Sequence, residues 1–258
     1  MSVYQANWVS FKTLVSKEVT RFMRIWSQTL LPPLINQSLY FIIFGTFIGS
    51  QVQDIRGISY MAFLVPGLVM MAVINSAFSN VVSSFFGNKF QRSIEELLVS
   101  PTPNWVIVAG YASGGVARGI LVGFLVFLVS FIFVRPEIYS LFFVSLFVIL
   151  TSIVFSLGGL LNGIFAKKFD DISLFTTFVL TPLTYFGGVF YSIHDLPPFW
   201  QKLSQLNPIL YMIDGFRYGF YGIADVNVGV SVGLLVIFAA GLSVLCLRLL
   251  KKGVGMRT

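Results

Sequence analysis

The sequence has almost none of the residues that build disulfides, metal centres or nucleotide sites. Its 258 residues include one cysteine, Cys246, and one histidine, His194. An intrachain disulfide is excluded, and these two residues by themselves do not supply a multi-ligand metal or haem site. No Gly-x-x-x-x-Gly-Lys-Ser/Thr stretch occurs, so the chain lacks the usual phosphate-binding loop. We therefore expect no resident cofactor and no ATPase activity from this chain alone.

Charge is scarce as well. Only 10% of the residues are charged, against about a quarter in an ordinary soluble domain, and 56% are hydrophobic. A water-soluble globule is nearly excluded. The formal net charge is +7, but the charges stand in short stretches between long uncharged runs, which argues against a nucleic-acid partner. Residues 1–24 have no short apolar core before a small-residue cleavage site, so no removable signal peptide is expected.

Six apolar runs are each long enough to cross a hydrocarbon core, which takes about 20 residues in a helix. An even number of crossings places both termini on one side. Of the Lys and Arg residues, 12 lie on that side and four on the other, with Arg118 inside a run. The positive-inside rule then assigns both termini to the cytoplasm. We expect an all-α membrane protein of one domain, residues 1–258, whose runs are 28–49, 60–82, 111–134, 140–165, 173–191 and 229–250.

The third run holds a charge and a spaced row of glycines. Residues 104–134 would form a helix of about 46 Å, which leaves a turn or two outside the hydrocarbon core. We expect Arg118 to extend toward the cytoplasmic headgroups rather than to be a buried functional arginine, because the run has no acidic partner. Gly115, Gly119 and Gly123 recur every four residues. Such a row allows close helix packing, either within the bundle or across a dimer.

The segment before the first run, residues 1–27, predicts an amphipathic helix. Apolar and aromatic side chains recur at steps of three or four between Trp8 and Trp26, and most basic residues fall elsewhere. Aromatic and basic side chains suit lipid headgroups, so we expect this helix to lie in the cytoplasmic interface and contact membrane lipid. The alternative is a helix packed on a partner protein.

A second short amphipathic helix is predicted after the second run, in the charged segment 89–99. Arg92 is spaced to pair with Glu95 or Glu96, and the prolines at 101 and 103 end the helix. A solvated connector needs no apolar stripe, so either the lower face of the bundle or the groove of a partner must cover this one. The stripe consists of Phe90, Ile94, Leu97 and Leu98.

The segment 192–227, before the last run, is too apolar and aromatic for a solvated loop. Pro198 and Pro208 suit the first turns of two helices, each too short to cross the membrane. We interpret them as half-helices that dip into the outer leaflet, with their backbone groups satisfied inside protein. Asp214 and Arg217, three residues apart, are expected to pair.

Uncharged polar side chains follow three of the runs. They indicate either a conduit for an amphipathic solute or hydrogen-bonding contacts between helices. No intramembrane carboxylate is available for proton coupling, which argues against a proton-driven transporter. The polar residues are Asn36 on the first run, Asn75, Ser76, Ser79 and Asn80 on the second, and Thr177, Thr181 and Thr184 on the fifth.

An acidic pair, Asp170 and Asp171, precedes the fifth run beside Lys167 and Lys168. In a membrane-embedded enzyme that modifies lipid, which is the alternative function, such a pair would hold a cation. No second acidic cluster completes that site. We favour a charged loop with its carboxylates at a helix N-terminus, where they interact well with the helix dipole.

The short helix with the apolar stripe and the outer half-helices, in this order and with six runs, resemble the membrane subunit of type-2 ABC exporters. This permease family includes drug-resistance, nodulation-factor and polysaccharide exporters. The resemblance covers essentially the whole chain. Its most specific stretches are the run from Phe90 to Pro101 and the motifs Leu196-Pro197-Pro198, Leu206-Asn207-Pro208 and Gly215-Phe216-Arg217.

By this resemblance the first stretch is a coupling helix that docks in a groove of a separate ATP-binding subunit, which binds the ATP and Mg. Two permeases, expected here as a homodimer, and two ATP-binding subunits form an exporter in the bacterial inner membrane. The coupling-helix residues so implied are Lys89, Phe90, Gln91, Arg92, Ile94, Glu95, Glu96, Leu97 and Leu98.

The same resemblance places the substrate path at the permease interface, bordered by the first, second and fifth helices and therefore by the polar residues named above. Pro32 and the Thr177 face are candidate residues of the dimer seam. An apolar wall with uncharged polar groups suits an amphipathic or lipid-linked cargo. The outer half-helices would form a lid on the exit, with Pro198, Trp200, Asn207, Pro208, Tyr211, Phe216 and Arg217 as lid residues.

Overall fold

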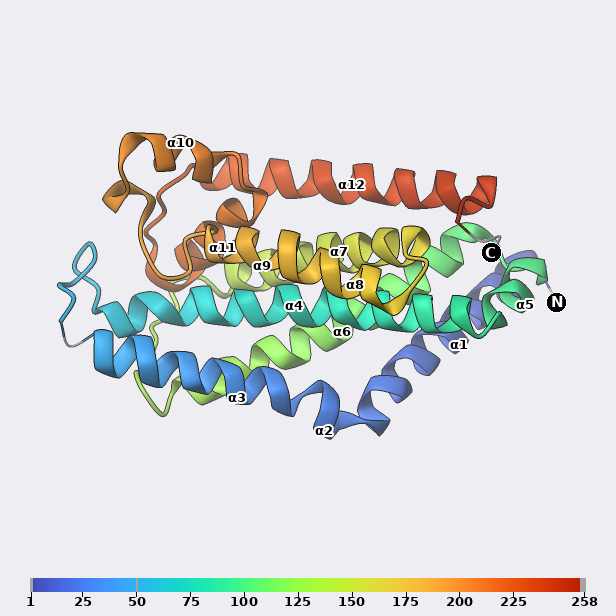
Figure 1. Ribbon diagram of the computed structural model, residues 1–258, viewed down its shortest axis with the longest axis horizontal. Helices are drawn as coiled ribbons and strands as arrows, with labels where there is room; N and C mark the ends of the chain where they lie inside the picture. The colour runs from blue at the N-terminus through green and yellow to red at the C-terminus, as the bar shows by residue number, and fades with distance from the viewer. Residues whose placement is uncertain (1, 50, 256–258) are drawn as a thin grey trace.

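The computed structural model describes residues 2–49 and 51–255, and every regular element in these ranges is a helix. The helices form an elongated bundle (Figure 1). One end, called here the α5 end, holds α1 (Val3–Arg24), α5 (Ser93–Val99) and the close of α12 (Val228–Lys252). The opposite end, called the α10 end, holds α10 (Pro198–Gln205) and the nearby α11 (Pro208–Tyr221). The described chain therefore begins and ends at the same end of the bundle.

Five helical stretches are long and apolar enough to cross a membrane. The first, Trp26–Ile48, consists of α2 (Trp26–Thr29), α3 (Leu31–Tyr40) and the π-helix η1 (Phe41–Ile48). The others are α4 (Tyr60–Phe90), α6 (Asn104–Ser130), α7 (Leu141–Phe165) and α12. They match five of the six predicted runs.

The predicted fifth run forms a shorter helical stretch. It comprises α8 (Phe169–Phe175), the π-helix η2 (Thr176–Leu180) and α9 (Thr181–Tyr185), which follow one another without a gap. This helix starts before the expected boundary, 173, and ends before the expected 191. The early end follows from Gly187 and Gly188, because Gly188 adopts a φ of +77° that a helix does not contain. The η3 turn (Ile193–Asp195) then leads to α10.

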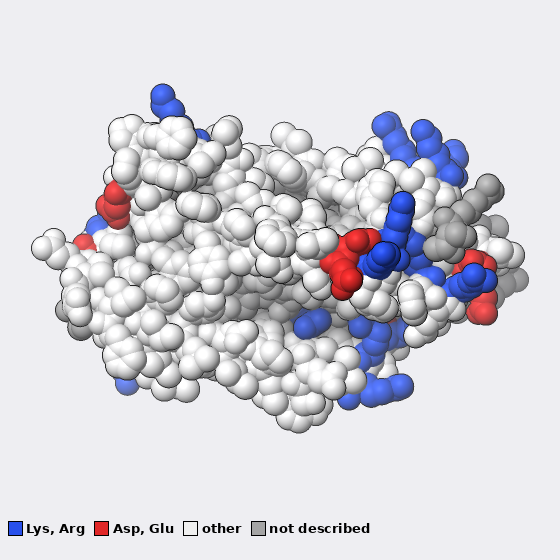
Figure 2. Space-filling model, viewed as in Figure 1, with Lys and Arg blue, Asp and Glu red and all other residues white. Residues whose placement is uncertain are grey.

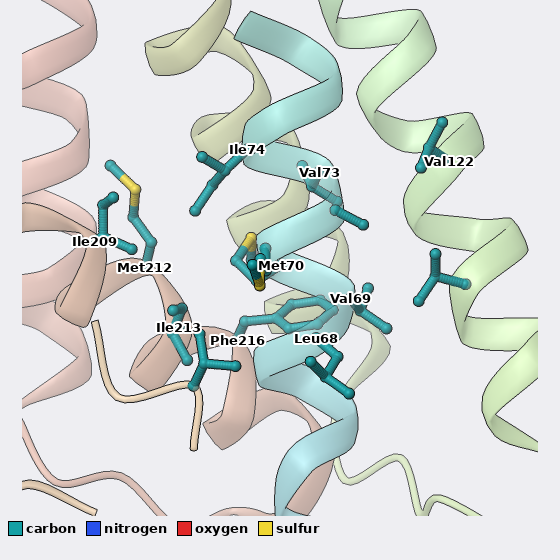
Figure 3. Close-up of a cluster of buried hydrophobic side chains, with 14 of the residues drawn as sticks. Leu68, Val69, Met70, Val73, Ile74, Val122, Ile209, Met212, Ile213 and Phe216 are labelled. Carbon is teal, nitrogen blue, oxygen red and sulfur yellow. The ribbon is translucent and has the colours of Figure 1, made fainter. Parts of the chain in front are cut away.

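Helix α4 is the central helix of the bundle, with buried side chains around its whole circumference. Figure 3 shows Val69 and Val73 of α4 on the side of Val122 from α6, while Met212 and Ile213 of α11 lie on the other side. A helix whose side chains are buried on every side in this way is covered by neighbouring protein rather than by lipid. The core of the molecule is therefore built around α4.

The glycine row of α6 serves contacts within this chain. A Cβ atom at Gly115 would lie 2.9 Å from the Ala77 carbonyl oxygen of α4, and one at Gly123 would lie 2.6 Å from Cγ2 of Val73. Both distances are shorter than van der Waals contact, so α6 approaches α4 this closely only with glycine at these positions. Of the two predicted uses, bundle and dimer, the bundle contact is confirmed.

Helix α1 packs along α6 through a face next to the predicted aromatic stripe. Leu14, Glu18 and Phe22 are buried, while Trp8 is 51% and Trp26 is 54% exposed. The predicted segment is thus helical, with one face of α1 against the bundle and the tryptophans of the segment on the surface. A buried Glu18 was not expected from the sequence pattern.

The prediction for Arg118 is wrong. Its side chain is buried, and Nη2 donates a hydrogen bond of 2.9 Å to the carbonyl oxygen of Thr29. The reason is local: residue 33 is proline, so it has no N–H to donate to the Thr29 carbonyl, four residues earlier in the first span. The guanidinium of Arg118 satisfies that buried carbonyl instead of reaching the headgroups.

Candidate functional site

The predicted coupling helix forms α5 at the end of the bundle that also holds the described chain ends. Ile94 is 1% exposed and packs with Phe85, Ile107 and Tyr111, and Leu97 and Leu98 pack against the same cluster. Of the two predicted covers for the stripe, the chain's own bundle is therefore the one observed for these three residues. The side chains left on the surface of this segment are Phe90, Gln91, Arg92, Glu95, Glu96 and Val99.

The turn before α5 is tight. Arg92 adopts a φ of 60°, in the left-handed region, and acts as the N-cap residue of α5. This turn points the helix back onto the bundle. Within residues 2–49 and 51–255, no ion pair joins Arg92 to Glu95 or Glu96, so the predicted pairing is not formed.

Lys89, predicted to face the ATP-binding subunit, is instead buried. Its Nζ donates hydrogen bonds to the carbonyl oxygens of Ile164, at 2.8 Å, and Ala166, at 2.7 Å. These carbonyls lie at the C-terminus of α7, where a helix has oxygens without internal donors and a partial negative charge. Lys89 therefore caps α7 and fastens the α4–α5 turn to it.

The exposed ring of Phe90 makes a second connection from this turn. It packs edge-to-face on Phe169 of α8, with ring centroids 5.1 Å apart, and Phe86 of α4 packs on the same ring. The segment that holds α5 is thus joined to the end of α7 by Lys89 and to the start of α8 by Phe90. Figure 2 shows Lys, Arg, Asp and Glu gathered around this end of the molecule.

Seven polar side chains of the first span, α4 and α6 lie around one cavity of about 260 Å³, which we call the α3–α4 hollow. Pro32 and Pro33 line it near α2, and Tyr40 also lines it. Four of the eight residues predicted for the substrate path are therefore together: Asn36, Asn75, Ser76 and Ser79. The seven polar residues are Gln28, Asn36, Gln37, Asn75, Ser76, Ser79 and Arg118.

Asn80, also predicted for the path, lies outside the hollow. Nη2 of Arg21 donates hydrogen bonds of 2.9 Å to both the backbone oxygen and Oδ1 of Asn80. Arg21 pairs in turn with Glu18 at 3.2 Å, and Glu18 accepts a hydrogen bond of 2.7 Å from Ser84. Asn80 thus belongs to a polar network that attaches α1 to α4. The sequence of the spans does not reveal this network, because two of its members, Glu18 and Arg21, lie before the first span.

The three threonines predicted for the path lie on the α8–α9 stretch, and none of them lines the hollow. Thr181 and Thr184 donate their hydroxyl hydrogens to carbonyls of the same stretch, those of Thr176 and Leu180. Thr177 is exposed. In Figure 1, α3 and α9 flank α4 on opposite sides.

An aromatic cluster joins α3 to α9 across α4. The hydroxyl oxygens of Tyr40 and Tyr185 are 2.5 Å apart, and Phe190 packs on both rings with centroids 5.8 and 5.6 Å away. Phe44 of η1 packs on Phe190 at 4.5 Å. We call Tyr40, Phe44, Tyr185 and Phe190 the aromatic closure. Because Tyr40 also lines the α3–α4 hollow, the closure stands at one end of that hollow.

Helices α10 and α11 begin at Pro198 and Pro208, which confirms the predicted helix starts. Asn207 caps α11 by accepting from the Ile209 N–H, and its Nδ2 donates to the Leu183 carbonyl of α9 at 2.6 Å. Trp200 stacks on Phe186 at 5.8 Å. These predicted lid residues therefore tie the segment to the end of the α8–α9 stretch.

Arg217 is buried in the same region and makes three contacts. Nη2 donates to the Gly188 carbonyl at 2.7 Å, Nη1 lies 3.9 Å from the Asp214 carboxylate, and the guanidinium lies 3.8 Å from the ring centroid of Phe63. The predicted Asp214–Arg217 pair is confirmed.

The remaining predicted lid residues have different surroundings. Phe216 is buried in the main core. Tyr211 donates to the Gln205 carbonyl at 2.8 Å, and Pro198 is exposed.

One member of the acidic pair before the fifth run, Asp171, caps a helix. Oδ2 of Asp171 accepts backbone hydrogen bonds from Lys167, at 2.7 Å, and Lys168, at 3.0 Å. No group of three or more His, Cys, Asp or Glu residues that suits a metal occurs among residues 2–49 and 51–255. The capping interpretation is confirmed for Asp171.

Comparison with known proteins agrees with this architecture. The ABC-2 type transporter family matches residues 9–221. The chain is 60% identical over 251 residues to the inner membrane transport permease YadH of Escherichia coli (strain K12), which covers 97% of this chain and 98% of YadH. Nodulation protein J of Rhizobium meliloti (strain 1021) is 24% identical over 234 residues, covering 90% of this chain and 88% of that protein. This chain therefore belongs to the ABC-2 type transporter family of membrane permeases.

Proposed function

We propose that the chain is the membrane-spanning subunit of an ATP-driven exporter in the bacterial inner membrane. Two copies pair, and each engages a separate ABC subunit that binds ATP and Mg. Family membership supports the transport role and the ATP-binding partner. The observation that carries the proposal is the α3–α4 hollow, which is polar inside an apolar bundle and ends at the aromatic closure.

The whole chain acts as one transmembrane domain with both ends in the cytoplasm. Five crossings are the long helical stretches, and the α8–α9 stretch, fifth in chain order, provides the remaining one of the six. Its 17 helical residues span about 26 Å, and the segment up to 191 completes the crossing. α1 lies in the cytoplasmic interface with Trp8 toward lipid. α10 and α11 occupy the outer leaflet, where their backbone groups are satisfied within helices.

The dimer seam is formed by the first span and the α8–α9 stretch. Both leave apolar side chains exposed: Phe47 and Ile43 on η1, and Phe178 on η2. Pro32 is exposed on the first span, in α3, and Thr177 is exposed on the α8–α9 stretch, in η2. Two such faces would bury each other in a symmetric pair, which places the two hollows near the interface.

Coupling follows the contacts at the α5 end. ATP binding brings the two partner subunits together and moves α5, and the turn before α5 transmits that motion through Lys89 to α7 and through Phe90 to α8. Tilting the α8–α9 stretch separates Tyr185 from Tyr40 and opens the hollow outward. Asn207 and Arg217 carry the movement to the lid because they are bonded to Leu183 and Gly188. ATP supplies the difference in affinity between the two packings.

The test reverses charge on the exposed face of α5. Glu95→Lys with Glu96→Lys is expected to abolish stimulation of the partner's ATPase in lipid discs while leaving the purified permease folded. The matched control, Asp54→Lys with Glu137→Lys, reverses two exposed acidic charges outside α5 and is expected to keep full stimulation. Equal ATPase rates in the two double variants would contradict the coupling role of α5.

A further inference from the structure

The α3–α4 hollow contains buried polar atoms without hydrogen-bond partners. Nε of Arg118, Oγ of Ser76 and Oε1 of Gln37 are all buried and unpaired. The three side chains are 8%, 2% and 4% exposed, and all line the hollow. They come from α6, α4 and α3, so three helices present hydrogen-bonding groups to one space. Buried polar groups are nearly always satisfied in folded proteins, so an unpaired set around a cavity indicates a ligand.

The charge at this place is also unbalanced. The recorded hydrogen bond of Arg118 goes to a neutral carbonyl, that of Thr29. Within the described residues no ion pair involves Arg118. The carboxylate of Glu18 is occupied by Arg21 and Ser84. A buried cation at membrane depth without a counter-ion is costly.

Figure 2 shows a small island of basic surface recessed between α3 and α4, apart from the charged cluster at the α5 end. The cavity is thus open to an incoming group. α3 also exposes Ile35 and Leu39. An apolar chain attached to a polar headgroup therefore has an apolar helix surface to follow.

We propose that the α3–α4 hollow binds the anionic headgroup, phosphate or carboxylate, of an amphiphile whose apolar chain lies along α3. Arg118 supplies the cationic donor from Nε, and Ser76 donates its hydroxyl hydrogen. Asn36 and Ser79 complete the rim. A guanidinium matches the geometry of a phosphate or carboxylate and forms charge-assisted hydrogen bonds with it. The inference deepens the proposed function by naming its substrate class, and its transport arm rests on that function.

The binding arm uses the purified full chain in a neutral maltoside detergent, titrated with dodecyl phosphate and, separately, with zwitterionic dodecylphosphocholine. We expect saturable binding of dodecyl phosphate that Arg118→Gln weakens at least tenfold. Arg24→Gln, an exposed basic residue at the end of α1, is the control and is expected to bind as the parent does. Equal affinity for the two amphiphiles, or unchanged affinity in Arg118→Gln, overturns the proposal.

A second variant decides the matter if Arg118→Gln does not fold. Ser76→Asp places a carboxylate in the hollow, where it supplies an internal counter-ion for Arg118. We expect this variant to lose dodecyl phosphate binding. Retained binding in Ser76→Asp overturns the proposal.

Two further arms separate the sources of the headgroup. If the amphiphile is cargo, dodecyl phosphate raises the ATPase rate of the complex with its ATP-binding subunit, and Arg118→Gln abolishes the increase. If it is a resident membrane lipid, native mass spectrometry finds an anionic phospholipid on the parent and not on Ser76→Asp, with no ATPase response. Either result supports an anionic headgroup site. The absence of both results, together with no saturable binding of dodecyl phosphate, overturns the proposal. The coupling test on Glu95 and Glu96 is independent of all these outcomes.

Discussion

The hydroxyl groups of Tyr40 and Tyr185 meet 2.5 Å apart, although the two residues are 145 positions apart in the chain. They join the first membrane span to the α8–α9 stretch on either side of the central helix. One wall of the α3–α4 hollow ends at Tyr40. The contact between Tyr40 and Tyr185 therefore connects the wall of the α3–α4 hollow to helix α9.

Removing this contact is expected to loosen the aromatic closure. Tyr40→Phe keeps the ring packing but removes one hydroxyl, and a net hydrogen bond contributes about 1 kcal/mol, or roughly a fivefold shift in an equilibrium. Because Cys246 is fully buried, the parent gives little thiol background. The measurement uses Asn36→Cys in right-side-out vesicles and a membrane-impermeant maleimide added outside them. The rate at which the maleimide labels this cysteine should rise severalfold in Tyr40→Phe. Tyr211→Phe, whose hydroxyl bonds to the Gln205 carbonyl, should not change it.

Lys89 is expected to matter for stability rather than for partner contact. Lys89→Met removes the donors to the Ile164 and Ala166 carbonyls and should destabilise the protein by about 1.5–3 kcal/mol, the range for hydrogen bonds to charged groups. Thermal unfolding in detergent measures the loss. Lys251→Met, at an exposed position near the end of α12, should leave the midpoint unchanged. A stable Lys89→Met protein that fails only in ATPase stimulation would contradict the capping role.

Glu18 is expected to hold α1 on the bundle through its charge. Glu18→Gln leaves Arg21 without its ionic partner, and breaking such a buried pair is destabilising by about 3–5 kcal/mol, with the lower end expected here because Arg21 is partly exposed. The readout is protease cleavage within residues 1–27, which should become faster. In the double variant Glu18→Gln with Ser84→Ala the two effects should not add, because both residues belong to one network. Additive effects would separate Ser84 from it.

Two glycine-to-alanine substitutions are expected to have opposite signs. Gly115→Ala forces apart α6 and α4, since its Cβ would lie 2.9 Å from the Ala77 carbonyl oxygen, and should destabilise by about 1–3 kcal/mol. Gly233→Ala, on α12, has no heavy atom within 4 Å of the added carbon and should stabilise by up to about 1 kcal/mol through helix propensity. Thermal midpoints of the two variants, measured side by side, check the signs. Equal shifts would contradict the close approach of α6.

The hydropathy pattern identified five of the long helices, and local turn chemistry identified the starts of α10 and α11 at Pro198 and Pro208. Both signals depend on residues within a turn or two of one another. The same local reasoning placed Arg118 at the interface and Lys89 against a partner. These two errors have one cause, because the carbonyls that hold the two side chains belong to helices distant in sequence.

The candidate path was predicted in part for the same reason. Asn36, Asn75, Ser76 and Ser79 were correctly grouped as polar residues on helices of the bundle, and they do line one hollow. Asn80 has the same residue type and helix as Asn75, yet Arg21 of α1 occupies it. Composition and periodicity indicate that a polar side chain faces protein, but not which helix lies opposite.

The sequence by itself determined that this protein is a helical membrane protein, because long apolar runs require a bilayer and helices satisfy their own backbone there. It also determined that Thr29 has a free carbonyl, since proline at position 33 has no N–H to give. Only the tertiary structure decided that Arg118 fills that vacancy from 89 residues away and stands, with Gln37 and Ser76, around an unbalanced polar hollow. The physical reason is that hydrogen bonding within a helix is local, whereas the pairing of a buried charge depends on which helices pack together.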